Sequence, residues 1–474
     1  MHRCSFTISA RHLYIGDKCR PTNINHKSYF RILNRLTHSN NRRPLAGLLI
    51  LAMVLVTVGG ALFGLFAPSQ FLWIAGLASW AAALLLICDV SRAQQIQVSV
   101  LVIVGALLMI YAIKKGVSVD FFKVITSNTG LLSMITAVGF LRLVAIPKSA
   151  ESAELPVGRQ AYLKTLLGTS LFGSVINISA PMLIADRIHR HRPLQRLTAQ
   201  SITRVFSACA AWSPFFAGMA VVLTYVNDAQ ILWIIAAGLP FAIVGLLVVY
   251  SEAIIHYSKD VKDFLGYPMQ IANLWIPALL AISVVLGTWL LPKLSILVVI
   301  ASSALLLTAT TLLIRTGFSS ASKQLYDHVV NALPHTVNEL VLFLAAGVLA
   351  TGISAIVQSG MLVLPITHFD ATMAIQLLGI IILIAAMGVH PVILISSLTP
   401  LLLSLNPNPN LLALTYLFAW SLGTCGSPLS GTHLVFQGRY GIPSWKAAIW
   451  NWPYVAVMYL LSSAWLYFIG NKFA

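Results

Sequence analysis

Apolar stretches separated by short polar breaks follow one another from Pro44 to the end of the chain. A helix of ~20 apolar residues spans the hydrocarbon core of a membrane, and most of these stretches have about that length. Several contain glycine, proline or polar clusters, so we expect broken helices and about ten to twelve true crossings. The pattern predicts helices over residues 45–66, 70–88, 97–114, 129–147, 163–187, 198–226, 228–255, 272–291, 294–315, 332–355, 372–388, 390–405, 411–436 and 448–469.

The composition agrees with lipid as the surrounding solvent. Hydrophobic residues make up 58% of the 474 and charged residues only 9%, and the mean hydropathy is +0.85. Soluble domains carry roughly a quarter charged residues. A chain this apolar and this long cannot keep its surface in water. The sequence therefore predicts an all-α polytopic membrane protein.

Basic residues outnumber acidic ones and give a formal net charge of +17. In a soluble protein this charge would suggest nucleic acid as a partner. Here the basic residues gather in the first 44 residues and in short loops, and membrane proteins retain such residues on the cytoplasmic side, beside anionic headgroups. We therefore predict a lipid bilayer and no nucleic acid as partner, a location in the bacterial inner (plasma) membrane, and a basic cytoplasmic tail over residues 1–44. A mitochondrial-type presequence is the alternative for that tail.

No motif in the sequence indicates enzyme chemistry or a bound metal. The chain has no phosphate-binding glycine loop, no H-E-x-x-H and no G-x-S-x-G motif. Its cysteines form no C-x-x-C pair, so neither a disulfide framework nor a zinc site is predicted; they are Cys4, Cys19, Cys88, Cys209 and Cys425. We expect no catalytic residue, no metal site and no cofactor.

Two pairs of helix breaks occur in the same order in the two halves of the chain. In the first half, Asn177-Ile178-Ser179-Ala180-Pro181 is followed by a segment that contains Ser213-Pro214. In the second half, Ser396-Ser397-Leu398-Thr399-Pro400 is followed at a similar distance by Ser427-Pro428-Leu429-Ser430. Self-similarity in matching order is typical of internal repeats. The sequence therefore predicts two transmembrane repeats, residues 45–257 and 258–474.

The charges between the breaks predict that the repeats have opposite orientations. Five arginines lie between the first pair of breaks: Arg187, Arg190, Arg192, Arg196 and Arg204. The segment Asn406-Pro407-Asn408-Pro409-Asn410, between the second pair, has no charge. Arginine-rich loops stay in the cytoplasm, so the uncharged loop is expected on the other side. Repeats of opposite orientation, with re-entrant hairpins and broken helices, are a known architecture of secondary transporters.

Broken helices in a membrane indicate a binding site, because every backbone polar group in hydrocarbon needs a partner. Freed N–H groups at the start of a half-helix favour an anion, and freed carbonyl and hydroxyl oxygens coordinate a cation. Ordinary kinks are the alternative, since glycine and proline are common in membrane helices. The residues predicted to bind substrate or ion are Asn177, Ser179, Pro181, Ser213, Pro214, Ser396, Ser397, Thr399, Pro400, Ser427, Pro428, Ser430 and Thr432.

A few ionisable residues lie within or beside these stretches. His433 follows the last break and is a candidate for proton coupling, with a structural histidine as the alternative. Arg142 interrupts an apolar stretch, where it is expected to snorkel or to pair with an acid. Asp186 is expected to mark a cytoplasmic helix end. Glu339 is expected to stabilise a helix start or to serve the site.

At these breaks the sequence resembles the ion transporter superfamily, most nearly its divalent-anion:sodium symporter branch. That branch carries Ser-Asn-Thr motifs at two hairpin tips, each followed by an unwound helix. Here Asn177-Ile178-Ser179 and Ser396-Ser397-Leu398-Thr399 take the tip positions, and Ser213-Pro214 and Ser427-Pro428 the unwound positions. The similarity extends loosely over residues 45–474, and neither tip is a literal Ser-Asn-Thr.

The one literal copy of that motif, Ser127-Asn128-Thr129, lies at the start of an earlier helix and is predicted to be a helix cap. The resemblance implies a homodimer, an elevator-like movement of the hairpins and broken helices, and sodium as a coupling ion. Repeats and resemblance together predict a secondary transporter of a small, carboxylate-like anion, coupled to sodium ions or protons. The alternatives are a cation/proton antiporter, a membrane-embedded enzyme such as a lipid-linked transferase, and an assembly subunit.

Overall fold

The computed structural model describes residues 26–64, 71–145, 154–268, 275–361 and 368–472, and within the first range it places side chains from residue 41 onward. The chain divides into two units, residues 1–42 and 43–474. Helix α1 (His26–Phe63) begins in the first unit, earlier than the residue 45 predicted. The rest of the predicted tail, with Cys4 and Cys19, lies outside the described residues.

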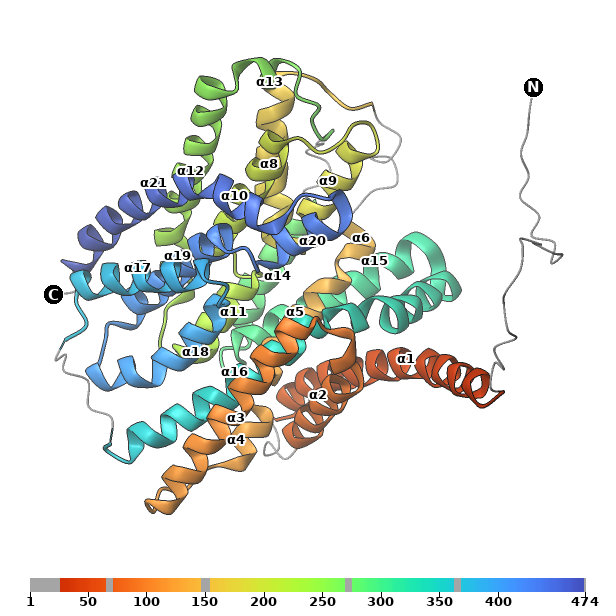
Figure 1. Cartoon of the computed structure of the whole chain (residues 1–474), viewed down its shortest axis with the longest axis vertical. Coiled ribbons are helices and arrows are strands. Elements are labelled where there is room, and N and C mark those ends of the chain that lie inside the picture. The colour runs from red at the N-terminus through yellow and green to blue at the C-terminus, as the bar shows by residue number, and fades with distance from the viewer. Residues whose placement is uncertain (1–25, 65–70, 146–153, 269–274, 362–367, 473–474) are drawn as a thin grey trace, which may run out of the picture. The chain divides into compact units, whose positions relative to one another are not determined.

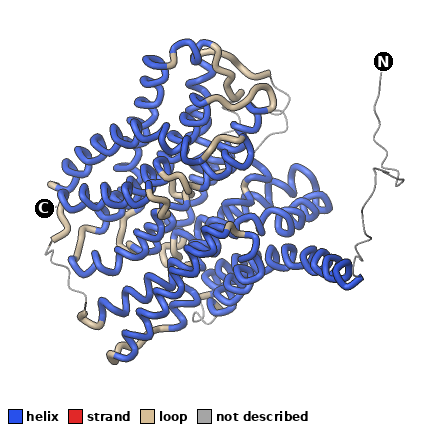
Figure 2. The backbone as a smooth tube through the Cα atoms, viewed as in Figure 1, coloured by secondary structure: helices blue, strands red, loops and turns tan. Residues whose placement is uncertain are grey.

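Helices account for most of the second unit, as Figure 2 shows. The described residues form no β-strand; Val157 and Leu265 form an isolated bridge. The helices after α1 and before the first hairpin are α2 (Leu72–Leu86), α3 (Arg92–Lys114), α4 (Phe121–Thr126), α5 (Thr129–Phe140) and α6 (Arg142–Ala145). Between the two sets of broken helices lie α13 (Ser258–Lys262), α14 (Trp275–Leu290), α15 (Ile296–Asp327) and α16 (Val337–Gln358).

Two sets of helices follow the same order of hairpin, broken helix and long helix. The first set is α8 (Arg159–Ile176), α9 (Ser179–His189), α10 (Arg196–Ala208), α11 (Ala217–Tyr225) and α12 (Ile231–His256). The second set is α17 (Ala371–Ala386), α18 (Pro391–Leu402), α19 (Pro409–Gly426), α20 (Gly431–Tyr440) and α21 (Ser444–Gly470). In Figure 1, α8 and α9 lie in the upper part of the second unit and α17 and α18 on its left side.

By length and composition, seven helical stretches in the described part of the chain are apolar enough to cross a membrane. One of them, Ile296–Gln358, has 63 residues, which is long enough for more than one crossing. Shorter apolar helices, Trp275–Leu290, Ala371–Ala386 and Pro391–Leu405, accompany them. The predicted fold class, a polytopic all-α membrane protein, is confirmed.

Close backbone contact joins α3 to α16. A Cβ atom built on Gly105 would lie 2.7 Å from the Val348 carbonyl oxygen, and one on Gly352 would lie 2.5 Å from the Gly105 carbonyl oxygen. No side chain larger than hydrogen fits at either position. Small residues allow membrane helices to approach this closely. Helix α16 also contacts α18, and α5 contacts α11, so these helices hold the two sets of broken helices.

Contacts between helix ends define one side of the second unit, called here the basic side. Arg439 at the end of α20 pairs with Asp186 at the end of α9. The guanidinium of Arg196, at the start of α10, lies 5.3 Å from the Trp450 ring near the start of α21. Arg159 at the start of α8 donates to the Tyr250 hydroxyl near the end of α12, at 2.6 Å. Both ends of the first hairpin, α8–α9, therefore lie on this side.

A second group of contacts defines the opposite side. The Gln230 N–H, before α12, donates to Asn410 Oδ1 at the start of α19, at 2.7 Å. The Trp465 indole, near the end of α21, donates to the Ala237 carbonyl oxygen near the start of α12. A Cβ built on Gly470 would lie 2.5 Å from Ala371 Cβ, at the start of α17. Both ends of the second hairpin, α17–α18, therefore lie on the opposite side.

The predicted break at Ser396–Pro400 is wrong. Helix α18 continues through it, with Pro400 inside the helix. The Ser397 hydroxyl donates to the Ile393 carbonyl oxygen at 2.5 Å, and the Thr399 hydroxyl to that of Ile395 at 2.6 Å. Such bonds satisfy the hydroxyls inside one helix, so these residues need no interruption. The interruption within this hairpin lies earlier, at residues 387–390, between α17 and α18.

Candidate functional site

Four interruptions of the helices define the candidate site. The first tip is residues 177–178, between α8 and α9, and the first break is residues 212–216, before α11. The second tip is residues 387–390, between α17 and α18, and the second break is residues 427–430, between α19 and α20. The predicted interruptions at Asn177, Ser213 and Ser427 are present.

The first tip is tied to the first break. Asn177 has a φ of 49°, a backbone conformation that residues other than glycine rarely adopt. Its amide nitrogen donates to the Phe215 carbonyl oxygen at 3.0 Å, and its Oδ1 atom is buried without a hydrogen-bond partner. The Ser213 hydroxyl donates to the Ser174 carbonyl oxygen, and the Phe215 N–H donates to Ser213 Oγ at 3.2 Å. Asn177 thus combines a rarely adopted backbone conformation with an unpaired side-chain oxygen.

The second tip contacts the second break directly and is linked to the end of the first break through Trp420. The His390 ring lies 5.1 Å from the Trp420 ring of α19, edge to face. The same indole lies against Gly218, just after the first break, where a built Cβ would be 3.0 Å from its ring. Gly388, with a φ of +97°, takes a conformation suited to glycine. A Cβ on it would lie 2.9 Å from the Leu429 side chain, in the second break.

The start of α20, directly after the second break, lies beside the first tip. A Cβ built on Gly431 would lie 3.5 Å from Ile178 Cδ1. Ser427 Oγ accepts from the Leu429 N–H at 3.3 Å, and Ser430 Oγ caps α20 by accepting from the His433 N–H at 3.4 Å. The two tips and two breaks therefore converge, although they are far apart in sequence.

A cavity of about 400 Å³ lies beside the first tip. Four arginines and one aspartate line it, a formal excess of three positive charges. One face of α9 forms a wall, Ser179 at the start of that helix included. The lining residues are Arg142, Ile178, Ser179, Met182, Leu183, Asp186, Arg187, Arg190, Tyr267, His335, Val435 and Arg439. The cavity combines positive charge, a helix start and an apolar wall, which together suit a small organic anion.

Asp186 is occupied within the protein. Its carboxylate accepts from Arg439 at 2.8 Å and from the Tyr440 hydroxyl at 2.6 Å. These bonds join the end of α9 to the end of α20 across the cavity wall. Asp186 lies near a helix end, as predicted, and the arginines beside it leave the cavity positive.

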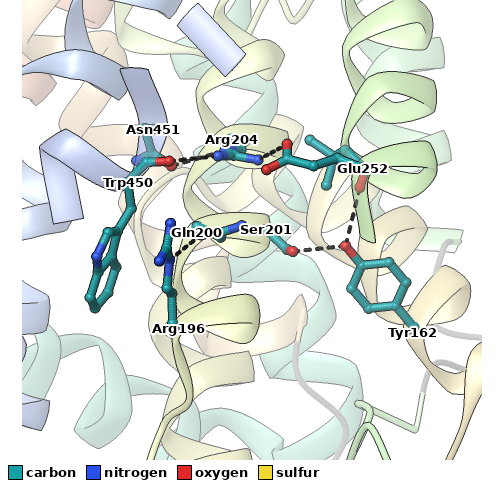
Figure 3. A network of polar contacts seen from close by, with 9 residues as sticks. Tyr162, Arg196, Gln200, Ser201, Arg204, Glu252, Trp450 and Asn451 are labelled. Atoms are coloured by element: carbon teal, nitrogen blue, oxygen red, sulfur yellow. Dashed lines mark hydrogen bonds and ion pairs between the residues drawn. The ribbon is translucent and has the colours of Figure 1, made fainter. Parts of the chain in front are cut away.

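An ion pair with a buried arginine lies between α10 and α12 (Figure 3). Arg204 is 1% exposed and contacts Glu252 Oε2 at 2.5 Å, and the Glu252 side chain is 23% exposed. It also donates to Asn451 Oδ1 at 3.0 Å and to the Trp450 carbonyl oxygen at 2.7 Å, both on α21. Arg204 lies in a helix, as predicted, but it is buried and so does not belong to the loop charges that indicate the cytoplasmic side. It lies inside the protein, where an arginine needs a partner.

The structure separates the predicted binding residues into two groups. Ser179 lines the cavity, Asn177 forms the first tip, and Ser213, Pro214, Ser427, Pro428 and Ser430 lie in the two breaks. Pro181 is buried in the first turn of α9, and Thr432 and His433 are buried in the first turn of α20. Ser396, Ser397, Thr399 and Pro400 lie within α18, and the hydroxyl of Thr399 also donates to Tyr416 at 3.0 Å. None of these four lies at a tip.

The predicted cap at Ser127-Asn128-Thr129 is also wrong in its contacts. Asn128 stands at the start of α5, but its side chain makes no capping bond. Its amide donates instead to the Phe343 carbonyl oxygen at 2.5 Å and to the Tyr225 hydroxyl at 3.3 Å. The motif thus joins α5 to α16 and α11.

Sequence reasoning missed the arginine lining of the cavity and Glu252. Arg142 begins α6 and faces the cavity instead of being a snorkelling residue of one long helix. The available signal was an ionisable residue within an apolar stretch, which marks a functional candidate. No group of three potential metal ligands occurs in the described part of the chain.

The described structure is that of a polytopic α-helical membrane protein. No protein-family model matches the sequence, and no curated protein matches it. Among solved structures, the YdaH transporter of Alcanivorax borkumensis is similar with a TM-score of 0.36 and 14% identity, over 94% of this chain and 89% of that chain. A likeness this distant supports no conclusion about the function of this chain.

Proposed function

We propose that this protein is a secondary active transporter of a small, carboxylate-like anion. The observation that carries the proposal is the positively charged cavity beside the first tip, where a re-entrant hairpin and two broken helices meet. Half-helix starts and arginines together suit an anion. Interrupted helices persist in a membrane where they line a protein cavity.

The contacts at helix ends support two inverted repeats, residues 45–257 and 258–474. The first hairpin begins and ends on the basic side, and α10–α11 then runs to the opposite side. The second hairpin begins and ends on the opposite side, and α19–α20 then runs to the basic side. The basic side is the cytoplasmic one in this proposal, with the basic tail in the cytoplasm of a bacterial inner membrane.

Single cysteines at Arg192 and Asn408 test this orientation. Arg192 lies in the loop between α9 and α10, and Asn408 at the cap of α19. We expect membrane-impermeant maleimide to label Arg192→Cys from the cytoplasmic face alone and Asn408→Cys from the other face alone, in a background without other reactive cysteines. Labelling of both from one face would remove the inverted repeat.

The coupling ion in this proposal is sodium or a proton. The unpaired Asn177 Oδ1 is an oxygen of the kind that sodium coordinates, and it lies at the first tip. His433 is a weaker candidate for proton coupling, because both ring nitrogens already have partners, the Ser427 carbonyl oxygen at 2.8 Å and Asn451 at 3.2 Å. The resemblance to the ion transporter superfamily suggests a homodimer and an elevator-like movement.

Replacement of His433 tests whether this residue couples transport to protons. Because its nitrogens are satisfied, we expect His433→Ala to leave the pH dependence of uptake unchanged while lowering its rate. The measurement is initial uptake between about pH 5.5 and 8.5, the range in which histidine titrates. A pH dependence that disappears in His433→Ala would assign proton coupling to this residue.

The other functions fit the described residues less well. A cation/proton antiporter ordinarily needs acids at the centre, and the two tips and two breaks contain none. A lipid-linked transferase needs a cluster of acids and histidines, and the one acid of the cavity is bound to Arg439 and Tyr440. An assembly subunit would not need the convergent interruptions.

Counterflow tests the carrier function directly. Liposomes that contain purified protein and a high internal concentration of one unlabelled anion are diluted into a trace of the same labelled anion. We expect transient accumulation for at least one member of a carboxylate and oxyanion panel, with protein-free liposomes as the control. Absence of counterflow for every member would reject the proposal.

A further inference from the structure

A continuous chain of polar contacts links the two sets of broken helices. It begins at Glu252 on α12 and passes through Arg204 on α10 to Asn451 on α21. Asn451 contacts His433 Nε2 on α20 at 3.2 Å, and His433 Nδ1 contacts the Ser427 carbonyl oxygen at 2.8 Å. Figure 3 shows the part of this chain from Glu252 to Asn451. Its last contact lies in the second break.

The donors and acceptors along the chain determine each other. The Arg204 Nε–H can only donate, so the atom of Asn451 that faces it is the acceptor Oδ1. The Asn451 amide nitrogen then donates twice, to the Cys425 carbonyl oxygen at 3.2 Å and to His433 Nε2. Nε2 therefore carries no hydrogen, and the single ring hydrogen lies on Nδ1, which donates to Ser427. His433 is neutral in this arrangement.

The Ser427 carbonyl oxygen accepts two hydrogen bonds. Ser427 is the C-cap of α19 and is 3% exposed, so its carbonyl lies where a helix has ended and water is scarce. The Ser430 N–H donates to it at 3.3 Å from within the break, and the His433 ring donates to it at 2.8 Å from α20. The shorter of the two bonds therefore joins the end of α19 to α20 across the break, and it depends on the orientation of one imidazole ring.

We propose that Arg204, Asn451 and His433 are positioning residues, which hold the second break in the shape that the candidate site requires. Asn451 acts through His433 by fixing which ring nitrogen carries the hydrogen. The importance of the break for activity rests on the proposed function, whereas the positioning of the break by these three residues does not depend on transport. In this proposal the ion pair also has a role: Glu252 holds the Arg204 side chain in place, and Arg204 sets the orientation of the Asn451 amide.

Protonation of His433 would oppose this arrangement. A second ring hydrogen, on Nε2, would face the Asn451 amide donor, and Arg204 is a positive neighbour on the other side of that amide. Titratable and charged groups beside this series of contacts include Tyr162 on α8, Arg204 on α10, Cys209 after it, Tyr250 and Glu252 on α12, Cys425 on α19 and Tyr454 on α21. Glu252 is the one acid among them, and it is bound to Arg204.

The exposed side chain of Leu429 allows a direct test, because it lies in the second break and is 45% exposed. The probe is the rate at which a maleimide labels Leu429→Cys in purified protein, located by peptide mapping. We expect Asn451→Ala to raise this rate by roughly tenfold, since it removes the amide donor that fixes the ring. The buried native Cys209 reports opening of the whole protein, and its rate is expected to stay unchanged.

Ser462→Ala is the matched control on the same helix. Ser462 is 2% exposed on α21. Its hydroxyl donates to the Met458 carbonyl oxygen of its own helix and contacts none of Glu252, Arg204, Asn451 and His433. We expect parental labelling for this control. Parental labelling for Asn451→Ala, or an equal rise at Cys209, would overturn the inference. If Asn451→Ala yields too little folded protein, His433→Ala against Ser462→Ala decides by the same criterion.

A conservative replacement separates positioning from simple packing. The amide of His433→Gln retains one donor and one acceptor, so labelling of Leu429→Cys is expected within about twofold of the parent. In uptake, without the added cysteine, Asn451→Ala should raise KM more than it lowers kcat, and His433→Gln should recover most of the loss. A His433→Gln variant that behaves as His433→Ala would contradict the assignment. Altered labelling in a protein that transports no anion would leave the positioning intact and reject the function alone.

Discussion

Glu252→Ala is expected to lower the free energy of unfolding by about 3–5 kcal/mol, because it leaves the buried guanidinium of Arg204 without its carboxylate. Removing one partner of a buried pair costs more than the pair itself contributes, since the remaining charge stays out of water. The measurement is reversible unfolding of the purified protein in mixed micelles, followed by far-UV circular dichroism.

An exposed ion pair of the same protein provides the control. Arg43 contacts Asp89 at 2.9 Å, and its side chain is 54% exposed. Arg43→Ala is expected to cost less than about 1 kcal/mol. Glu252→Gln keeps an acceptor for Arg204, so its loss of unfolding free energy should lie between those of Glu252→Ala and Arg43→Ala. Equal losses for Glu252→Ala and Arg43→Ala would show that Arg204 is not confined by its buried contacts.

Arg142→Gln is expected to weaken anion binding about tenfold to hundredfold. Arg142 lines the cavity from α6, and α9 forms another part of its wall. A hydrogen bond to a charged group contributes about 1.5–3 kcal/mol, which corresponds to this loss of affinity. The measurement is the rise in melting temperature with anion concentration, since a ligand that binds only the folded state stabilises it.

Arg159→Gln is the matched control for the cavity. Arg159 carries the same charge, but it bonds to the Tyr250 hydroxyl and does not line the cavity. Its replacement should leave the apparent Kd for the anion within about twofold of the parent. If both variants weaken binding equally, the effect belongs to the net charge of the protein, and the cavity is not the binding site.

The sequence predicted the helices and three of the four interruptions, because hydrophobic length and proline or asparagine within an apolar stretch are local signals. It misplaced the second tip. Serine, threonine and proline at 396–400 suggested a break, but those hydroxyls bond to carbonyls of their own helix, so α18 continues. The real tip at 387–390 was marked by Gly388, whose positive φ a sequence does not display.

The cavity could not be predicted from the sequence. Arg142, Arg187 and Arg439 lie in three different elements, and only the packing of α6, α9 and α20 brings them together. The pairing of Arg204 with Glu252 is equally non-local. Arg204 was counted with the loop arginines on charge alone. Its burial, which distinguishes it from those arginines, is a property of the tertiary structure.

Gradient-driven uptake tests the proposed function most directly. Purified protein in liposomes is given an anion that produces counterflow, with an imposed inward sodium gradient, an imposed pH gradient, or neither. A secondary active transporter should accumulate the anion above its external concentration under one gradient, and Arg142→Gln should reduce this accumulation at low substrate while Arg159→Gln does not. Equilibration to the external concentration under every gradient, or no uptake at all, would contradict secondary active transport.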